Sequence, residues 1–381
     1  MEAYNDGLPS TPSLLIVPQF YKAGNLYQDV PPFVAEDLTM RFTVSRNTTA
    51  TRVNSSGLIE SVASGVPRID WLGQSCPALL VEPGAQNQAL WSRDLSVSGT
   101  WAASGITAVR NAVGADGAAS GATTLTATAA SATITQNISH SSQSRIFSAY
   151  MRRVSGSGQI QLTTNGGTNW QTVTLTSAFA PFNSGAQTVA SGQVGIRMIA
   201  SGDVIEVDFT QAEVGPNATS SIPTTSGAVS RAEDVISASG ALVSGLIGQT
   251  EGTMYFEVSD VKGVGTGTGN PALSIRDAAL TNWIGLISNS VSTPFRIQVR
   301  STTTTLINYT SAITEGKAAI AYSASGAVVY VNGVEVASTA TNPNLTLNLV
   351  RMEQYMPFKV KSLALYTTRL SNAQLAELTR L

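Results

Sequence analysis

The chain of 381 residues contains a single cysteine, Cys76, and a single histidine, His140. One cysteine excludes an intrachain disulfide and a zinc site built from cysteines. A Ser-His-Asp triad needs its histidine beside a nucleophile and an orienting acid, whereas His140 lies in the polar segment ISHSS. We therefore interpret His140 as a solvated loop residue.

Charge is also scarce, since only 12% of the residues are charged and the formal net charge is −2 at pH 7. Nucleic-acid binding needs a concentrated basic face, and the sequence has no run of Lys or Arg, so we expect no nucleic-acid partner. No apolar run is long enough to span a bilayer, so we expect no membrane insertion. The N-terminal segment lacks the basic region and apolar core of a signal peptide, which favours synthesis in a cytoplasm.

Glycine, serine, threonine and alanine are abundant instead, and 43% of the residues are hydrophobic. This composition favours stacked sheets with polar outer faces over disorder, which goes with high charge and few β-branched residues. Short segments rich in β-branched and aromatic residues alternate with Gly, Ser and Asn turns, for example at 145–153, 204–209 and 358–366. The Asn332-Gly333 pair between two valines is a strong hairpin signal. We predict an all-β protein made of β-sandwiches.

The N-terminal part predicts two segments that precede the sandwiches. Residues 1–44 contain five prolines and no periodic apolar pattern, so we expect an extended arm that docks on a neighbouring chain or back on its own body. Residues 45–84 predict a collar of short strands. Within the collar, Asn54 and Gly57 favour a tight hairpin turn, and Pro67 makes the residues around it extended.

The only convincing helix is the last element of the chain. Ser371 is its expected N-cap, and Gln374, three residues later, completes a capping box. Three leucines at helical spacing would form a stripe that packs on the sandwich, namely Leu375, Leu378 and Leu381.

Two segments resemble a motif pair that recurs in bacteriophage tail-fibre and other virion proteins. The first comprises RNTTATRVNSSGLIESVASGVPRIDW and CPALLVEPGAQNQALWSRDLS, and the second is QAEVGPNATSSIPTTSGAVSRAED. At Gln86-Asn87-Gln88 the chain departs from the Thr-Asn-Leu of that family. The pair brackets residues 85–234, which the resemblance implies is a jelly roll similar to carbohydrate-binding modules. The matching positions of the first segment beyond residue 85 are Asn87, Leu90, Ser92, Asp94, Leu95 and Trp101.

The C-terminal half, residues 235–381, is similar to laminin-G or concanavalin-like jelly rolls. The segments that carry this likeness are VVYVNGVEV and FKVKSLALYTTRLSNAQLAEL. The two resemblances imply an extended arm and a short-strand collar, followed by two jelly-roll β-sandwiches and a short C-terminal helix.

The resemblance implies a bacteriophage virion structural protein of fibre or appendage type, and not an enzyme. The arm and collar would attach it to other virion proteins, and the jelly rolls would bind host-surface glycan or protein. Fibres of this kind are homotrimers that assemble in the host cytoplasm and end in the virion. Two alternatives stay open: a head-fibre, head-decoration or tail scaffold protein without a receptor role, and a glycan depolymerase. We also expect that deleting residues 1–83 prevents incorporation into particles and leaves residues 85–381 folded.

Sugar binding would use an aromatic face as a stacking platform, with amides that hydrogen-bond to hydroxyls. Trp170 with its neighbour Asn169, in a polar loop, is the best candidate, and Trp283 is the second. The alternative for each tryptophan is a place in the core, which we favour for Trp283 because Ile-Gly-Leu-Ile follows it.

Acidic residues alternate in the segment Ile205–Asp208. Glu206 and Asp208 would point to one face of a strand, about 7 Å apart, which is near the spacing of glycosidase carboxylates. The alternative is the last strand of a binding module, which we favour, so we predict no catalytic residues. We expect no cofactor, although Asp94 and Asp208 together are candidates for a structural calcium site.

Overall fold

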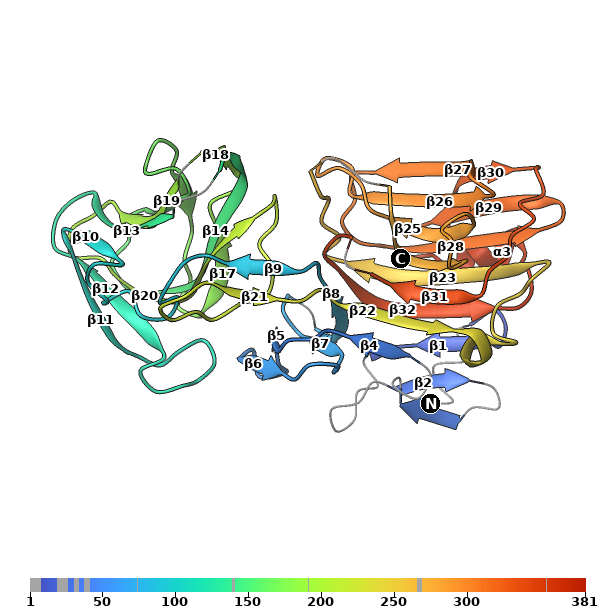
Figure 1. The fold of residues 1–381 in the computed structure, drawn as a ribbon, viewed down its shortest axis with the longest axis horizontal. Helices are drawn as coiled ribbons and strands as arrows, with labels where there is room; N and C mark the ends of the chain where they lie inside the picture. Colours follow the sequence, from blue (N-terminus) through green and yellow to red (C-terminus); the bar gives the residue numbers. More distant parts are fainter. Residues whose placement is uncertain are drawn as a thin grey trace. The chain divides into compact units, whose positions relative to one another are not determined.

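The structure is a computed structural model that describes residues 8–18, 27–30, 34–37, 42–73, 75–138, 141–190, 192–265, 269–353 and 355–381. The described residues are almost entirely β-strands and loops, with a short helix near the C-terminus (Figure 1). This confirms the all-β prediction. The chain divides into two compact units. Unit 1 comprises Met1–Asn47, Ser64–Pro83 and Glu233–Leu381, and unit 2 comprises Thr48–Ala63 and Gly84–Ala232.

Unit 1 is a sandwich of two sheets. The larger has the order β3-β2-β1-β32-β23-β28-β29-β30, with β8 also paired to β32 and β7 to β8. Its strands are β1 (Leu14–Ile16), β2 (Tyr27–Val30), β3 (Val34–Asp37), β7 (Arg68–Asp70), β8 (Ala78–Val81), β23 (Gly252–Ser259), β28 (Gly316–Ser323), β29 (Gly326–Val331), β30 (Val334–Thr339) and β32 (Phe358–Tyr366).

The second sheet of unit 1 has the order β27-β26-β25-β24-β31-β22-β4. Its strands are β4 (Thr43–Ser45), β22 (Val235–Ser239), β24 (Pro271–Arg276), β25 (Trp283–Ile287), β26 (Phe295–Ser301), β27 (Thr304–Ser311) and β31 (Leu349–Met352). One apolar core includes side chains of both sheets, among them the fully buried Phe256 and Phe358 of the first and Phe295 of the second. Burial of these side chains is the main source of the unit's stability.

The N-terminal segment packs within unit 1. Strand β1 pairs with β32, with Leu15 opposite Ala364. Leu14 and Ile16 are fully buried in the core between the sheets, and Leu15 packs on the other face of the sheet. Of the two outcomes expected for the arm, the described residues 8–18 therefore dock on the chain's own body.

The predicted collar, residues 45–84, is shared between the two units and does not form a unit of its own. Its hairpin, β5 (Ala50–Val53) and β6 (Ile59–Val62), belongs to unit 2. The turn has the predicted chemistry, because Asn54 Oδ1 accepts the backbone N–H of Ser56 at 2.9 Å and Gly57 has a φ of +76°. Strands β7 and β8 belong to unit 1, where Ile69, Leu79 and Val81 lie in the core. Because the core of unit 1 includes these side chains, we now expect that residues 85–381 do not fold alone.

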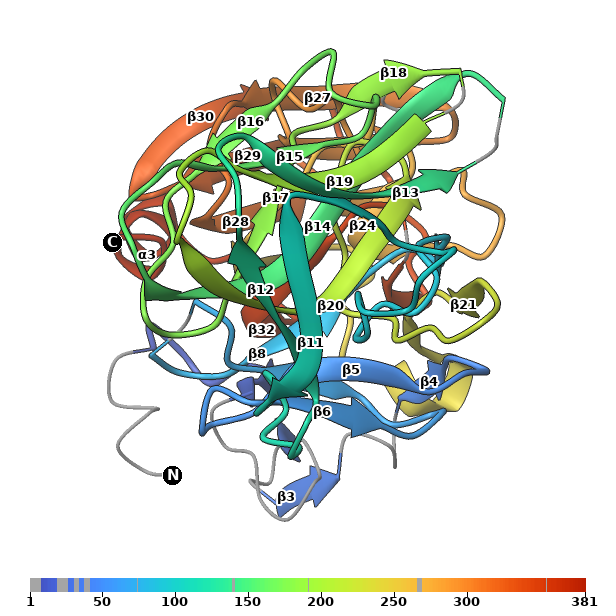
Figure 2. The same cartoon turned by 90° about the vertical axis from the view of Figure 1, so that its left-hand side faces the viewer.

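Unit 2 is a second sandwich, and most of its strands are labelled in Figure 2. Its five-stranded sheet has the order β10 (Ala102–Ser104), β13 (Ala132–Ile138), β19 (Gly192–Met198), β15 (Ile160–Thr163) and β16 (Gln171–Val173). Its six-stranded sheet comprises β11 (Ile106–Ala112), β12 (Ala122–Ala127), β20 (Val204–Val214), β14 (Gln143–Ser155), β17 (Ala180–Asn183) and β18 (Gln187–Val189). A short pair, β9 (Ala85–Asn87) and β21 (Val229–Arg231), joins the two ends of the stretch Gly84–Ala232.

Helix α3 (Asn372–Leu378) has the predicted capping box. Ser371 Oγ accepts the N–H of Gln374 at 3.3 Å, and Gln374 Oε1 accepts the N–H of Ser371 at 2.9 Å. Leu375 and Leu378 are buried against the sheet of unit 1, whereas Leu381 is 82% exposed. The predicted stripe was wrong at Leu381 because the helix ends before it. Among the described residues, no helix has the length and apolar character needed to cross a membrane.

We expect Ser371→Ala to lower the unfolding free energy of unit 1 by about 1 kcal/mol, because it removes one half of the capping box. Ser371→Asp keeps a side-chain acceptor at the N-cap and is the matched control. Chemical denaturation of the three proteins checks this prediction. An unchanged midpoint for Ser371→Ala would show that the cap does not stabilise the unit.

Candidate functional site

The two segments that resemble virion proteins meet at Asn87, which is completely buried in unit 2. Its Nδ2 donates to the carbonyl oxygens of Thr210 at 2.9 Å and Ile222 at 2.8 Å. Its Oδ1 accepts the backbone N–H groups of Ala89 and Ala212, both at 3.0 Å. All four hydrogen-bonding positions of this amide are therefore used within the protein.

Other residues that match the virion-protein motif are also hydrogen-bonded within unit 2. Ser92 Oγ accepts the N–H of Thr224 at 2.8 Å, and Gln211 Oε1 accepts the N–H of Ile222 at 2.6 Å. Trp101 is buried and its Nε1 donates to the carbonyl of Leu90 at 3.1 Å. The paired segments thus hold the start and the end of the stretch Gly84–Ala232 together.

We expect Asn87→Ala to destabilise unit 2 by about 3 kcal/mol, because it leaves four buried backbone groups without partners. Gln86→Ala changes an exposed neighbour and should stay within about 0.5 kcal/mol of the natural protein. Urea denaturation followed by tryptophan fluorescence compares the two variants. Equal midpoints for both would refute the structural role of Asn87.

The outward face of the five-stranded sheet carries a row of neutral polar side chains. Along β13 and β19 the apolar residues point inward, among them the fully buried Ile134 and Ile196. The alternate positions face outward, and the strand register places them side by side. These outward positions are Thr133, Thr135, Asn137, Gln193, Gly195, Arg197, Gln161 and Thr172. Arg197 is the one charged residue of this row, and its Nε donates to Gln161 Oε1 at 2.7 Å.

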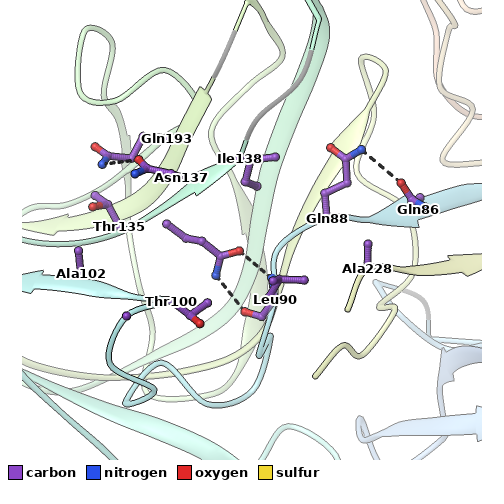
Figure 3. Close-up of a pocket in the computed structure, with 12 residues that line it drawn as sticks. Gln86, Gln88, Leu90, Thr100, Ala102, Thr135, Asn137, Ile138, Gln193 and Ala228 are labelled. Carbon is purple, nitrogen blue, oxygen red and sulfur yellow. Dashed lines mark hydrogen bonds between the residues drawn. The ribbon is translucent and has the colours of Figure 1, made fainter. Parts of the chain in front are cut away.

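A pocket of about 470 Å³ opens at one end of this face. Figure 3 shows Asn137 and Gln193 on one side of it and Gln86 and Gln88 on the other. The amides are ordered in pairs, since Gln193 Nε2 donates to Asn137 Oδ1 at 2.9 Å and Gln88 Nε2 to Gln86 Oε1 at 3.2 Å. None of the described lining residues is charged; the remaining ones are Leu90, Gly99, Thr100, Ala102, Thr135, Gln136, Ile138 and Ala228. The volume suits a small polar ligand or one residue of a polymer.

Trp170 lies in the loop that joins two strands of the same sheet, β15 and β16. Its indole is half-buried, and the guanidinium of Arg197 stacks on it at 4.5 Å from the ring centroid. Asn169 is exposed, and its backbone N–H donates to Asn165 Oδ1 at 2.9 Å. The structure thus links this sequence candidate, through Arg197, to the outward face that leads to the pocket.

Trp283 has a different environment, in β25 of unit 1. It is 4% exposed, its Nε1 donates to Gln298 Oε1 at 3.3 Å, and Arg300 stacks on its ring at 4.5 Å. A ring with so little free surface cannot stack on a sugar. The structure therefore removes Trp283 from the candidates, in agreement with the core alternative.

The acidic strand does not form a free carboxylate pair. Glu206 lies 2.5 Å from Arg152 Nε. Asp208 is completely buried and accepts two hydrogen bonds from Arg93, with Nε at 2.8 Å and Nη2 at 3.0 Å. Each carboxylate therefore has its own arginine partner, which does not suit a general acid and nucleophile.

The calcium candidates, Asp94 and Asp208, also pair with arginine side chains. Asp94 lies 3.7 Å from Arg110, and Asp208 binds Arg93, which reaches Asp116 at 2.7 Å as well. Burial alone would lower the pKa of Arg93, but the hydrogen bonds and charges of its two aspartates outweigh this and raise it. A guanidinium thus fills the place that calcium would need at Asp208. Within the described residues, no group of three or more His, Cys, Asp or Glu side chains could hold a metal ion.

No motif in the sequence pointed to the pocket. A signal was present, because ATIT at 132–135 and QVGIR at 193–197 alternate polar and apolar residues, as half-exposed strands do. The sequence does not show the strand pairing that places β13 beside β19.

His140 lies outside the described residues.

No protein-family model matches the sequence, and a search of curated proteins finds no match. Among solved structures, the binding domain of botulinum neurotoxin DC is 11% identical, and the match covers 38% of each chain with a TM-score of 0.29. A xylan-binding domain from Paenibacillus barcinonensis is 11% identical over 35% of this chain and 94% of that chain, with a TM-score of 0.25. Trypanosoma rangeli sialidase is 10% identical over 97% and 98%, with a TM-score of 0.28. These likenesses are too distant to establish the fold or the function. The β-sandwich assignment rests on the chain's own sheets.

Proposed function

We propose that the chain is a bacteriophage virion structural protein of fibre or appendage type, and that unit 2 binds a host-surface glycan. The observation that carries the binding role is the row of neutral amides and hydroxyls that leads from Trp170 to the 470 Å³ pocket. Amide and hydroxyl groups match the donors and acceptors of sugar hydroxyls, and an indole offers an apolar face to a sugar ring.

The virion role rests on the paired sequence segments. Residues of the two segments that lie more than 120 positions apart share hydrogen bonds, as between Asn87 and Ala212 and between Asn87 and Ile222. This supports a single module as the source of the resemblance. Attachment to other virion proteins, a homotrimeric state and assembly in the host cytoplasm belong to the same proposal.

We expect Trp170→Ala to weaken glycan binding about tenfold, which is the loss of one stacking platform. Phe179→Ala is the matched control, because Phe179 also carries a stacked arginine, Arg152, at 4.6 Å, but on the other sheet of the unit. A glycan array followed by calorimetry on the strongest ligand measures both variants. Equal losses in the two variants, or no glycan ligand for the natural protein, would refute the binding role.

The position on the particle separates this proposal from its alternatives. Immunogold labelling of intact particles should place the protein on a tail fibre or another host-facing appendage. Labelling of the head, together with an empty glycan array, would leave the head-fibre, decoration or scaffold role. Cleavage of a bound glycan would favour a depolymerase, against which the arginine partners of Glu206 and Asp208 argue.

A further inference from the structure

Arg145 is a buried cation beside the same pocket, and it has no acidic partner among the described residues. It comes from β14 and is 4% exposed. Its Nη1 donates to Oε1 of Gln88, which lines the pocket. Its Nε and Nη2 are buried, and within the described part of the chain neither has a hydrogen-bond partner. Burial lowers the pKa of Arg145, as expected for a cation without a neighbouring carboxylate.

The two donors without partners are those of one edge of the guanidinium. Nε–H and Nη2–H lie parallel on this edge, which is the geometry that binds both oxygens of a carboxylate. Arg93, in the same unit, uses this edge for Asp208, with Nε to Oδ1 at 2.8 Å and Nη2 to Oδ2 at 3.0 Å. Arg145 thus presents a carboxylate-binding edge of the same kind without its carboxylate.

The corner formed by Arg145 and Gln187 contains a second polar side chain with an unpaired atom among the described residues. Gln187 lies opposite Arg145 in the register of β14 and β18. Its Oε1 is buried, and none of the described residues donates a hydrogen bond to it. Within the described residues, neither the Nε and Nη2 edge of Arg145 nor Gln187 Oε1 therefore has a partner in this corner. Buried groups of this kind normally have partners, so a ligand that supplies both would complete the corner.

We propose that the glycan bound by unit 2 is acidic, and that a sugar carboxylate binds the Nε and Nη2 edge of Arg145. A hydroxyl of the same sugar donates to Gln187 Oε1. This inference rests on the proposed glycan-binding function and names its ligand class. Gln88 covers the guanidinium from the pocket side, held by Gln86 at 3.2 Å, and it is the side chain that moves as the sugar enters. A carboxylate-bearing sugar suits the corner because it carries the acceptor and the donor on one ring.

The test is a glycan array on which each uronic-acid oligosaccharide stands beside its carboxyl-reduced counterpart. We expect the natural protein to bind the acidic member of a pair at least tenfold more tightly. Arg145→Gln should bring this ratio to about one, and Arg145→Lys should restore it only in part, because an ammonium lacks the two-donor edge. Equal or stronger binding of the carboxyl-reduced members would overturn the inference and leave glycan binding intact. Binding of neither member would refute the proposed function as well.

Thermal unfolding without ligand separates a ligand-binding arginine from a structural one. A buried cation without a counter-ion is destabilising, so Arg145→Gln should raise the melting temperature or leave it unchanged. Arg93→Gln should lower it, because it leaves Asp208 and Asp116 without their cation. A lower melting temperature for Arg145→Gln would show that the protein itself satisfies this guanidinium, which would overturn the inference.

Discussion

A chain that starts at residue 85 should fail to fold unit 1. The deletion removes β1, β7 and β8, which supply five buried side chains of the core: Leu14, Ile16, Ile69, Leu79 and Val81. Burial of each contributes about 1.5–3 kcal/mol, so together they contribute about 7–15 kcal/mol, as much as the whole stability of a typical domain. The deletion also exposes the edge of β32, which pairs with β1 and β8. Such an edge favours aggregation.

Analytical size exclusion and heat denaturation of residues 85–381 check this result. We expect aggregated protein that lacks the unfolding transition of unit 1. A chain that starts at Leu8 keeps all five side chains and serves as the matched control. A monodisperse 85–381 chain with the unfolding profile of the control would contradict the assignment of β1, β7 and β8 to the core.

The second large effect is expected at a buried ion cluster in unit 1. Asp234 lies between two arginines, with Arg46 Nη1 at 2.9 Å and Arg68 Nη2 on its other oxygen. Arg68 also binds Glu82 at 2.7 Å, and the backbone of Glu82 bonds to Asp234 in both directions at 3.0 Å. All four side chains are 5% exposed or less. Arg46, Glu82 and Asp234 flank three of the four points at which the chain passes between the units.

We expect Asp234→Ala to cost about 3–5 kcal/mol of unfolding free energy, because it removes a carboxylate that pairs with two buried guanidinium groups. Burial alone would lower the pKa of Arg68, but the charges of Asp234 and Glu82 outweigh it and raise the pKa. Loss of Asp234 removes the larger of these two charge interactions. Asp234→Asn keeps the shape without the charge and should fall between Asp234→Ala and the natural protein.

Glu377→Ala is the control for this series. It breaks an exposed ion pair of the same unit, in which Glu377 lies 2.5 Å from Arg380, and pairs of this kind contribute about 1 kcal/mol or less. Guanidinium chloride would screen these charges, so urea denaturation is the suitable measurement. If Asp234→Ala and Glu377→Ala unfold at the same urea concentration, the buried cluster does not stabilise unit 1.

Local features of the fold were predictable from neighbouring residues. The Asn332-Gly333 hairpin is present, with positive φ at both residues, +49° and +85°. The turn at Asn54 and the capping box at Ser371 are present as well. Each of these depends on residues within five positions of one another, so the sequence contains the whole interaction.

The candidate site was predictable only in part. Trp170 was identified as a tryptophan in a polar loop, and the apolar residues that follow Trp283 favoured the core for it, in agreement with its burial. Gln88 departs from the family pattern at the position that contacts Arg145. That departure was visible, but its partner is 57 residues away, and the sequence alone does not show which residues lie across such a distance.

The sequence by itself determined the all-β class, the turns, the helix cap and the low charge, because each follows from composition or from residues close together in the chain. Only the tertiary structure decided that residues 8–18 and β7 belong to the core of unit 1 and that the hairpin of the collar belongs to unit 2. It also decided which arginines have carboxylate partners. The physical reason is that antiparallel pairing and charge compensation join residues that lie far apart in the sequence. Short apolar segments are compatible with many strand registers, and packing in the core determines which one forms.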